Sequence, residues 1–161
     1  MKPRKHWWVW IIVLLYIYFI FSNSMKVAEA SNQASIKVTW FIVHLLERIG
    51  IYANFSVFHG FVRRLAHFSE FAGLGFLVTL ALSICPLFNS RFLNFLLFLI
   101  AIPVADETIQ RYFAGRSSQL ADMIIDGSGF LSGGILGYLF VLVIKDLFQR
   151  HKTKSADVQE Q

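Results

Sequence analysis

The chain has 161 residues, of which 56% are hydrophobic and 16% are charged, whereas a soluble domain carries about 25% charged residues. Its long uncharged runs instead indicate a membrane protein, and its single cysteine, Cys85, excludes an internal disulfide and a cysteine-rich metal site. The formal net charge of +5 does not indicate a nucleic-acid partner, because many of the basic residues gather near the chain ends, where they can face anionic lipid head groups.

The first hydrophobic run predicts a transmembrane helix over residues 7–23. Basic residues precede this run and three tryptophans stand at its start, as at the cytoplasmic interface of a first span. A cleaved signal peptide is the alternative, because the Ala-Glu-Ala of residues 28–30 resembles a small-residue cleavage site. The membrane span is favoured, since the run is rich in Trp and Tyr and ends well before that motif.

The segment between the first two hydrophobic runs, residues 25–60, is mixed in character. Its apolar residues recur at helical spacing: Ile36, Trp40, Val43, Leu46 and Ile49. Charged residues occupy the other faces of such a helix. The pattern predicts a short amphipathic helix that lies at the membrane surface between spans one and two.

The second predicted span covers residues 65–84 and carries two ionisable residues, His67 and Glu70, within its first two turns. Together with Arg63 they follow the spacing i, i+4, i+7, so all three share one helical face. Charged groups in hydrocarbon carry a penalty of about 2.5 kcal/mol or more unless they are paired, hydrated or used. This face is therefore a candidate functional surface.

The third predicted span covers residues 92–107 and ends on a pair of acids, Asp106 and Glu107. Pro103, near that end, removes one helical hydrogen bond and predicts a kink just before the acids. Gln110 lies one turn beyond Asp106, so their side chains are neighbours if the helix continues.

The fourth predicted span covers residues 124–144. Two acids and three glycines form a single stripe along it: Asp122, Asp126, Gly129, Gly133 and Gly137. Glycines at this spacing allow another helix to approach closely. Basic residues follow the span, and residues 153–161 are predicted to be disordered.

Together these elements predict one all-α integral membrane domain over residues 1–161, a bundle of four transmembrane helices with the additional interfacial helix. Basic residues at both ends of the chain place the N- and C-termini in the cytoplasm. With four spans, the polar ends of all of them, from Ser22 to Asp126, then fall on one outer face of the membrane. Polar residues scattered without a role would have no reason to converge in this way.

The ordered set of polar motifs resembles the VanZ-like membrane proteins, named for an accessory protein of teicoplanin resistance. The matching pieces, in chain order, are Phe21-Ser22-Asn23-Ser24, the block of residues 64–71, Asp106-Glu107 with Gln110, Gly115-Arg116, and residues 122–126 leading into the glycine-rich span. Arg64 stands where the family often has Lys, and Phe71 where Tyr is common. The resemblance covers residues 7–138 and implies a multi-pass protein of the bacterial cell membrane and a link to antibiotic resistance.

Two interpretations of the polar residues involve no catalysis. In the first, they form ion pairs that hold the spans in register. In the second, they bind or mask a component of the cell envelope, such as a lipid-linked cell-wall precursor or a glycopeptide's target, and so lower susceptibility to teicoplanin-type glycopeptides. The predicted ligand-binding residues are Arg64, His67, Glu70, Asp106, Glu107, Gln110, Arg116, Asp122 and Asp126.

A membrane-embedded enzyme acting on a lipid or lipid-linked head group is the alternative. Its candidate catalytic residues are His67, Glu70, Asp106, Asp122 and Asp126. The carboxylates could hold a divalent cation, Mg²⁺ or Ca²⁺, through oxygen ligands, with His67 as general base. A zinc site would require more His or Cys ligands on one face than His67 alone offers. The binding function is preferred over catalysis.

Overall fold

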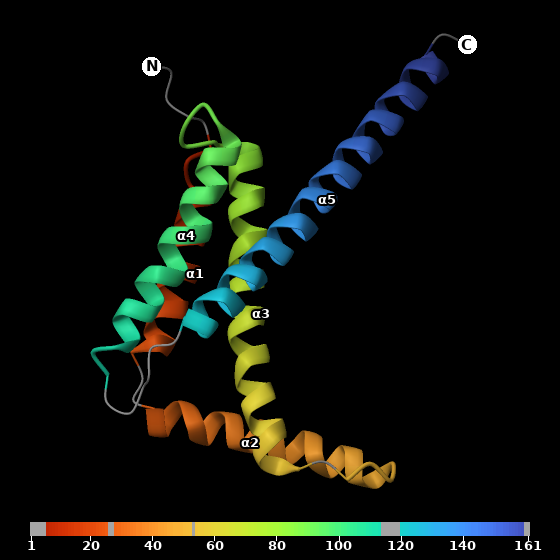
Figure 1. Cartoon of the computed structure of the whole chain (residues 1–161). Coiled ribbons are helices and arrows are strands. Elements are labelled where there is room, and N and C mark those ends of the chain that lie inside the picture. The colour runs from red at the N-terminus through yellow and green to blue at the C-terminus, as the bar shows by residue number, and fades with distance from the viewer. Residues whose placement is uncertain (1–5, 26–27, 53, 114–119, 160–161) are drawn as a thin grey trace.

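The computed structural model describes residues 6–25, 28–52, 54–113 and 120–159, and within these ranges the chain is helical without strands. Its five helices are α1 (Val9–Ser24), α2 (Ala28–Arg48), α3 (Phe55–Ile84), α4 (Arg91–Gln110) and α5 (Leu120–Gln159) (Figure 1). The predicted all-α class is therefore confirmed.

Three helices are long and apolar enough to cross a membrane: α3, α4 and the Leu120–His151 part of α5. The helix of the first predicted span, α1, is apolar but has 16 residues. At 1.5 Å per residue it rises about 24 Å, less than the roughly 30 Å of a hydrocarbon core. The structure thus supports a multi-pass membrane protein with three clear spans, one fewer than predicted.

Helix boundaries depart from the predicted ones in three places. α3 begins ten residues before the predicted start at residue 65, because Asn54 caps it by accepting the Ser56 N–H at 3.0 Å. α2 has 21 residues, so it is not short, and it lies across the N-terminal start of α3 (Figure 1). α5 continues to Gln159 through most of the segment predicted to be disordered, since no Gly or Pro follows Gly137 to end it.

The glycine stripe of α5 packs directly against α3. A Cβ atom placed on Gly133 would lie 1.8 Å from the Ala72 carbonyl oxygen, and one on Gly129 would lie 2.3 Å from that of Phe68. The predicted close approach is therefore confirmed, and it is a contact between backbones. Because residue numbers rise together along the contact, α3 and α5 run in the same direction (Figure 1).

Helix α1 runs antiparallel to α3 and fills the other side of the core. At its start, the Trp10 indole donates a hydrogen bond to the Cys85 carbonyl at the end of α3 (2.9 Å) and stacks on Phe98 of α4 at 5.5 Å. Farther along, Val13 and Ile20 are buried in one apolar cluster with residues of α3 and α5. The end of α1 consequently reaches the same end of the bundle as the end of α4 and the start of α5 (Figure 1).

Candidate polar site at one end of the bundle

Asp106 joins α1 to α4 at this end. The Ser24 hydroxyl donates to Asp106 Oδ1 at 2.5 Å, and the Gln110 side-chain amide donates to Asp106 Oδ2 at 2.7 Å. The helix continues past Pro103, so Gln110 lies one turn from Asp106, as predicted. Asp106 and its neighbour Glu107 are fully buried. Both oxygens of the Asp106 carboxylate are thus held by side chains of the bundle.

A second hydrogen bond joins α1 to α3. The Asn23 amide donates to Glu70 Oε1 at 3.0 Å. The polar residues that end the first hydrophobic run therefore meet those of the second and third predicted spans. This confirms the convergence of the polar clusters at one end of the bundle, as far as the described residues go.

Asp126 of α5 is the least satisfied of the buried acids. It is 0% exposed, and neither of its carboxylate oxygens forms a hydrogen bond with a described residue. His67 of α3 lies beside it, with its Nδ1 3.7 Å from Asp126 Oδ1. A buried carboxylate is stable only when its charge is compensated by a partner or a cation, or removed by a proton. Asp126 is therefore a candidate position for binding a cation.

Side chains from three helices bring possible metal-ligand atoms close together. One donor atom each from His67, Asp106 and Asp126 lie within 4.8 Å of one another. Metal–ligand distances of about 2.0–2.6 Å place the ligands of one ion at such separations. One imidazole and two carboxylates suit a divalent ion such as Mn²⁺ or Mg²⁺ and leave coordination positions open.

This set differs from the predicted ligands in two respects. His67 lies among the candidate ligands, whereas we expected a general base, and Glu70 instead accepts a hydrogen bond from Asn23. Asp122 is not among the three donors but lines the cavity described next.

A small cavity of about 170 Å³ adjoins this point. Its walls are formed by α3 and the start of α5: Gly60, Arg63, Arg64, His67, Asp122, Ile125 and Asp126. Neither arginine forms an ion pair with a residue in the described part of the chain. The cavity thus combines two available guanidinium groups from α3 with one buried and one half-buried carboxylate from α5, those of Asp126 and Asp122.

The structure brings together eight of the nine predicted ligand-binding residues at this end. Gln110 and Glu107 lie with Asp106 in the buried part, and Glu70 is half-buried beside Asn23. Arg64 and Asp122 line the cavity. His67 and Asp126 belong to both parts. Arg116, with Gly115, lies outside the described residues.

Three residues of this site were missing from the predicted set: Asn23, Ser24 and Arg63. Each carries a signal in the sequence. Asn23 and Ser24 end the first hydrophobic run, and Arg63 lies one turn before His67 on the same helical face. The partners of Asn23 and Ser24, however, belong to other helices, and no spacing within one helix identifies such partners.

One protein-family model, VanZ/LLP1, matches residues 7–145. A search of the curated proteins and a search of the solved structures each found no match. The family match begins at the first hydrophobic run and ends after the apolar part of α5, so it includes every polar residue described above. The chain therefore belongs to the VanZ/LLP1 family.

Proposed function

We propose that the polar end of the bundle binds, and thereby masks, an anionic head group of a cell-envelope component. The cavity beside His67 and Asp126 is the observation that carries this proposal, because Arg63 and Arg64 line it without ion-pair partners among the described residues. A guanidinium grips phosphate or carboxylate through paired hydrogen bonds. A lipid-linked cell-wall precursor offers such groups at the membrane surface.

The acids around the cavity would repel an anion if their charges were uncompensated. A divalent cation held by His67, Asp106 and Asp126 removes this conflict, because it offsets two buried carboxylates. It also offers open coordination positions to the head group, since two of its three ligands line the cavity. The cation and the arginines then hold the same anionic group from two sides.

The proposal places this end at the outer face of a bacterial cell membrane, with both termini in the cytoplasm. It treats α1 as a fourth span. α1 contacts the end of α3 through Trp10 and reaches Glu70 of α3 through Asn23, so it accompanies α3 over much of its length. The basic residues that precede α1 and those that follow the apolar part of α5 favour a cytoplasmic location for both ends.

The function can be tested by labelled-glycopeptide binding to bacteria that express the chain. Expression of the parent is expected to lower surface binding of fluorescent teicoplanin, and Arg63→Gln/Arg64→Gln is expected to restore it. The matched control is Lys37→Gln/Arg48→Gln, which removes two exposed basic groups from α2. Equal membrane accumulation of all three proteins is required. Unchanged masking in the arginine variant, or no masking by the parent, would contradict the proposal.

Metal-dependent catalysis on a head group is the second candidate function, favoured by the three donor atoms within 4.8 Å of one another. A bound divalent ion would polarise a phosphoryl oxygen while water attacks phosphorus and the bond to the leaving oxygen breaks. Arg63 and Arg64 would stabilise the charge that develops on the phosphoryl oxygens. Metal-dependent release of phosphate from a lipid diphosphate, absent in Asp126→Asn, would favour catalysis over simple binding.

A further inference from the structure

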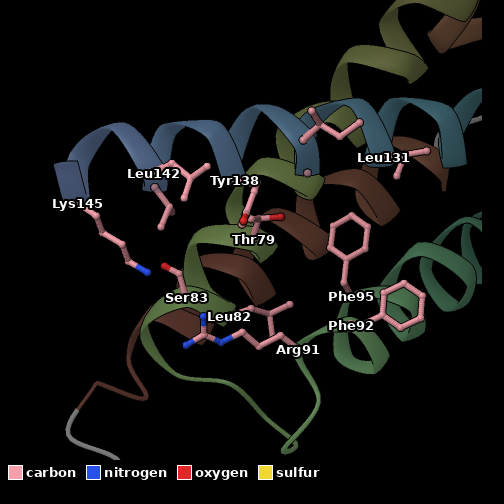
Figure 2. A pocket seen from close by; sticks show the side chains of 13 residues that line it. Thr79, Leu82, Ser83, Arg91, Phe92, Phe95, Leu131, Tyr138, Leu142 and Lys145 are labelled. Carbon is pink, nitrogen blue, oxygen red and sulfur yellow. The ribbon is translucent and has the colours of Figure 1, made fainter.

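A groove lies between α3, α4 and α5, toward the end of the bundle opposite the polar site (Figure 2). Its volume is about 520 Å³, within the range of small-molecule sites. Most of its walls are apolar, formed by Leu82, Phe92, Phe95, Leu131, Ile135 and Leu142. The groove would suit a hydrocarbon chain.

Two basic side chains stand at one end of the groove. Arg91, the first residue of α4, and Lys145 of α5 extend toward it from opposite sides (Figure 2). Neither forms an ion pair with a residue that the structure describes. The N-terminus of α4 adds its partial positive charge at the same place. This end of the groove is therefore suited to an anion.

The groove is long enough to hold an acyl chain across the hydrocarbon depth of one bilayer leaflet. Leu131 and Lys145 both line it, and at 1.5 Å per residue the stretch of α5 between them rises about 21 Å. Half of a hydrocarbon core is about 15 Å. Gly134 keeps α5 close to Phe95, because a Cβ there would lie 2.4 Å from the Phe95 ring. No side chain at that position can fill the groove.

We propose that this groove binds an anionic glycerophospholipid of the surrounding bilayer. One acyl chain lies along the apolar walls, and the phosphate lies between Arg91 and Lys145. The charge at the rim decides between lipids, since a zwitterionic head group carries a cation that the two basic side chains repel. The site is separate from the proposed head-group site at the other end and does not depend on its function.

Native mass spectrometry of the detergent-purified chain tests the proposal. The probes are phosphatidylglycerol and phosphatidylcholine with identical acyl chains. We expect the parent to retain phosphatidylglycerol preferentially, and Arg91→Gln/Lys145→Gln to weaken that binding by about 30-fold, or about fivefold for each basic residue. Lys37→Gln/Arg48→Gln removes the same charge from α2 and is expected to keep the preference.

A second variant tests the groove itself. Ser83 lines the groove, and its hydroxyl bonds only within its own helix, to the Leu80 carbonyl at 2.7 Å. Ser83→Phe is expected to reduce retention of both lipids while the thermal unfolding temperature stays near that of the parent. Equal retention of the two lipids by the parent would overturn the proposal. The proposal would also be overturned if Lys37→Gln/Arg48→Gln weakened phosphatidylglycerol binding as much as Arg91→Gln/Lys145→Gln does. It would likewise be overturned if the chain formed a dimer that displaces the lipid from the groove.

Discussion

Helix α5 makes two contacts of opposite character with the rest of the bundle. Its glycine stripe meets α3 backbone to backbone, with Gly133 against Ala72, through shape alone. One to two turns earlier, Asp126 lies buried beside His67 of the same α3, where shape contributes little and charge dominates. The first contact is complete as the chain stands, whereas the second leaves a carboxylate without hydrogen bonds among the described residues.

This difference separates stability from function within one helix pair. The glycine contact presents no side-chain donor or acceptor to a ligand, so changes there affect folding. A buried carboxylate without hydrogen bonds destabilises the bundle unless a cation or another ligand binds to it. Residues of the second kind are therefore candidates for binding, and the two contacts should respond differently to substitution.

The largest effect is expected for Gly133→Leu. A side chain there would overlap the Ala72 carbonyl, because even a Cβ atom would lie 1.8 Å from its oxygen. We expect a loss of at least about 3 kcal/mol of stability, at the upper end of overpacking effects, and poor membrane accumulation. The matched control is Gly127→Leu, since a Cβ on Gly127 meets no atom within 4 Å. Equal unfolding temperatures of the two variants in detergent would argue against the glycine interface.

A smaller but clear effect is expected for Asp106→Ala. The substitution removes the acceptor of both Ser24 and Gln110, which are themselves buried. Two donors without partners predict a loss of about 2–4 kcal/mol. Thr108→Ala, two residues away, is the control, because the exposed Thr108 hydroxyl bonds only to Val104 of its own helix. An unchanged unfolding temperature for Asp106→Ala would show that α1 and α4 are joined by other contacts.

The smallest effect of the three is expected for Asn23→Ala. Its side chain is half-buried, and its amide donates a hydrogen bond to Glu70 at 3.0 Å. Loss of one such bond costs about 1 kcal/mol. Chemical denaturation of the purified protein would resolve this difference. A loss of stability as large as that of Asp106→Ala would mean that the half-buried hydrogen bond of Asn23 contributes as much as the buried hydrogen bonds of Asp106.

The sequence predicted the helices and the polar end for separable reasons. Hydrophobic runs and glycine spacing follow from one helix at a time, so the spans and the Gly129–Gly133 contact with α3 were predictable. The bounds of α1 were predictable to within two residues, since a span over residues 7–23 was expected and the helix is Val9–Ser24, but the bonding partner of its polar last residue was not. Ser24 lies inside the helix but bonds to Asp106.

The composition of the site was predictable only in part. Spacing within α3 relates His67 to its own face, but its distance to Asp106 depends on how α3, α4 and α5 pack. The choice among four acids as partners of His67 therefore required the structure. Residue spacing also could not show that Glu70 accepts a hydrogen bond from Asn23 of α1.

The central claim is that the polar end is a binding site built around a divalent cation. Asp126→Asn tests it, since this change removes a charge without adding bulk. The control is Asp122→Asn, which alters an acid of the cavity wall that is not one of the three donors. Both variants are expected to keep an unfolding temperature close to that of the metal-free parent.

The deciding measurement is the metal content of the purified chain after dialysis against Mn²⁺, determined by mass spectrometry beside the unfolding temperature. We predict about one ion per chain for the parent and for Asp122→Asn, and none for folded Asp126→Asn. A parent without a bound ion, or an Asp126→Asn variant that retains it, would contradict the account and leave the polar end as a set of structural contacts.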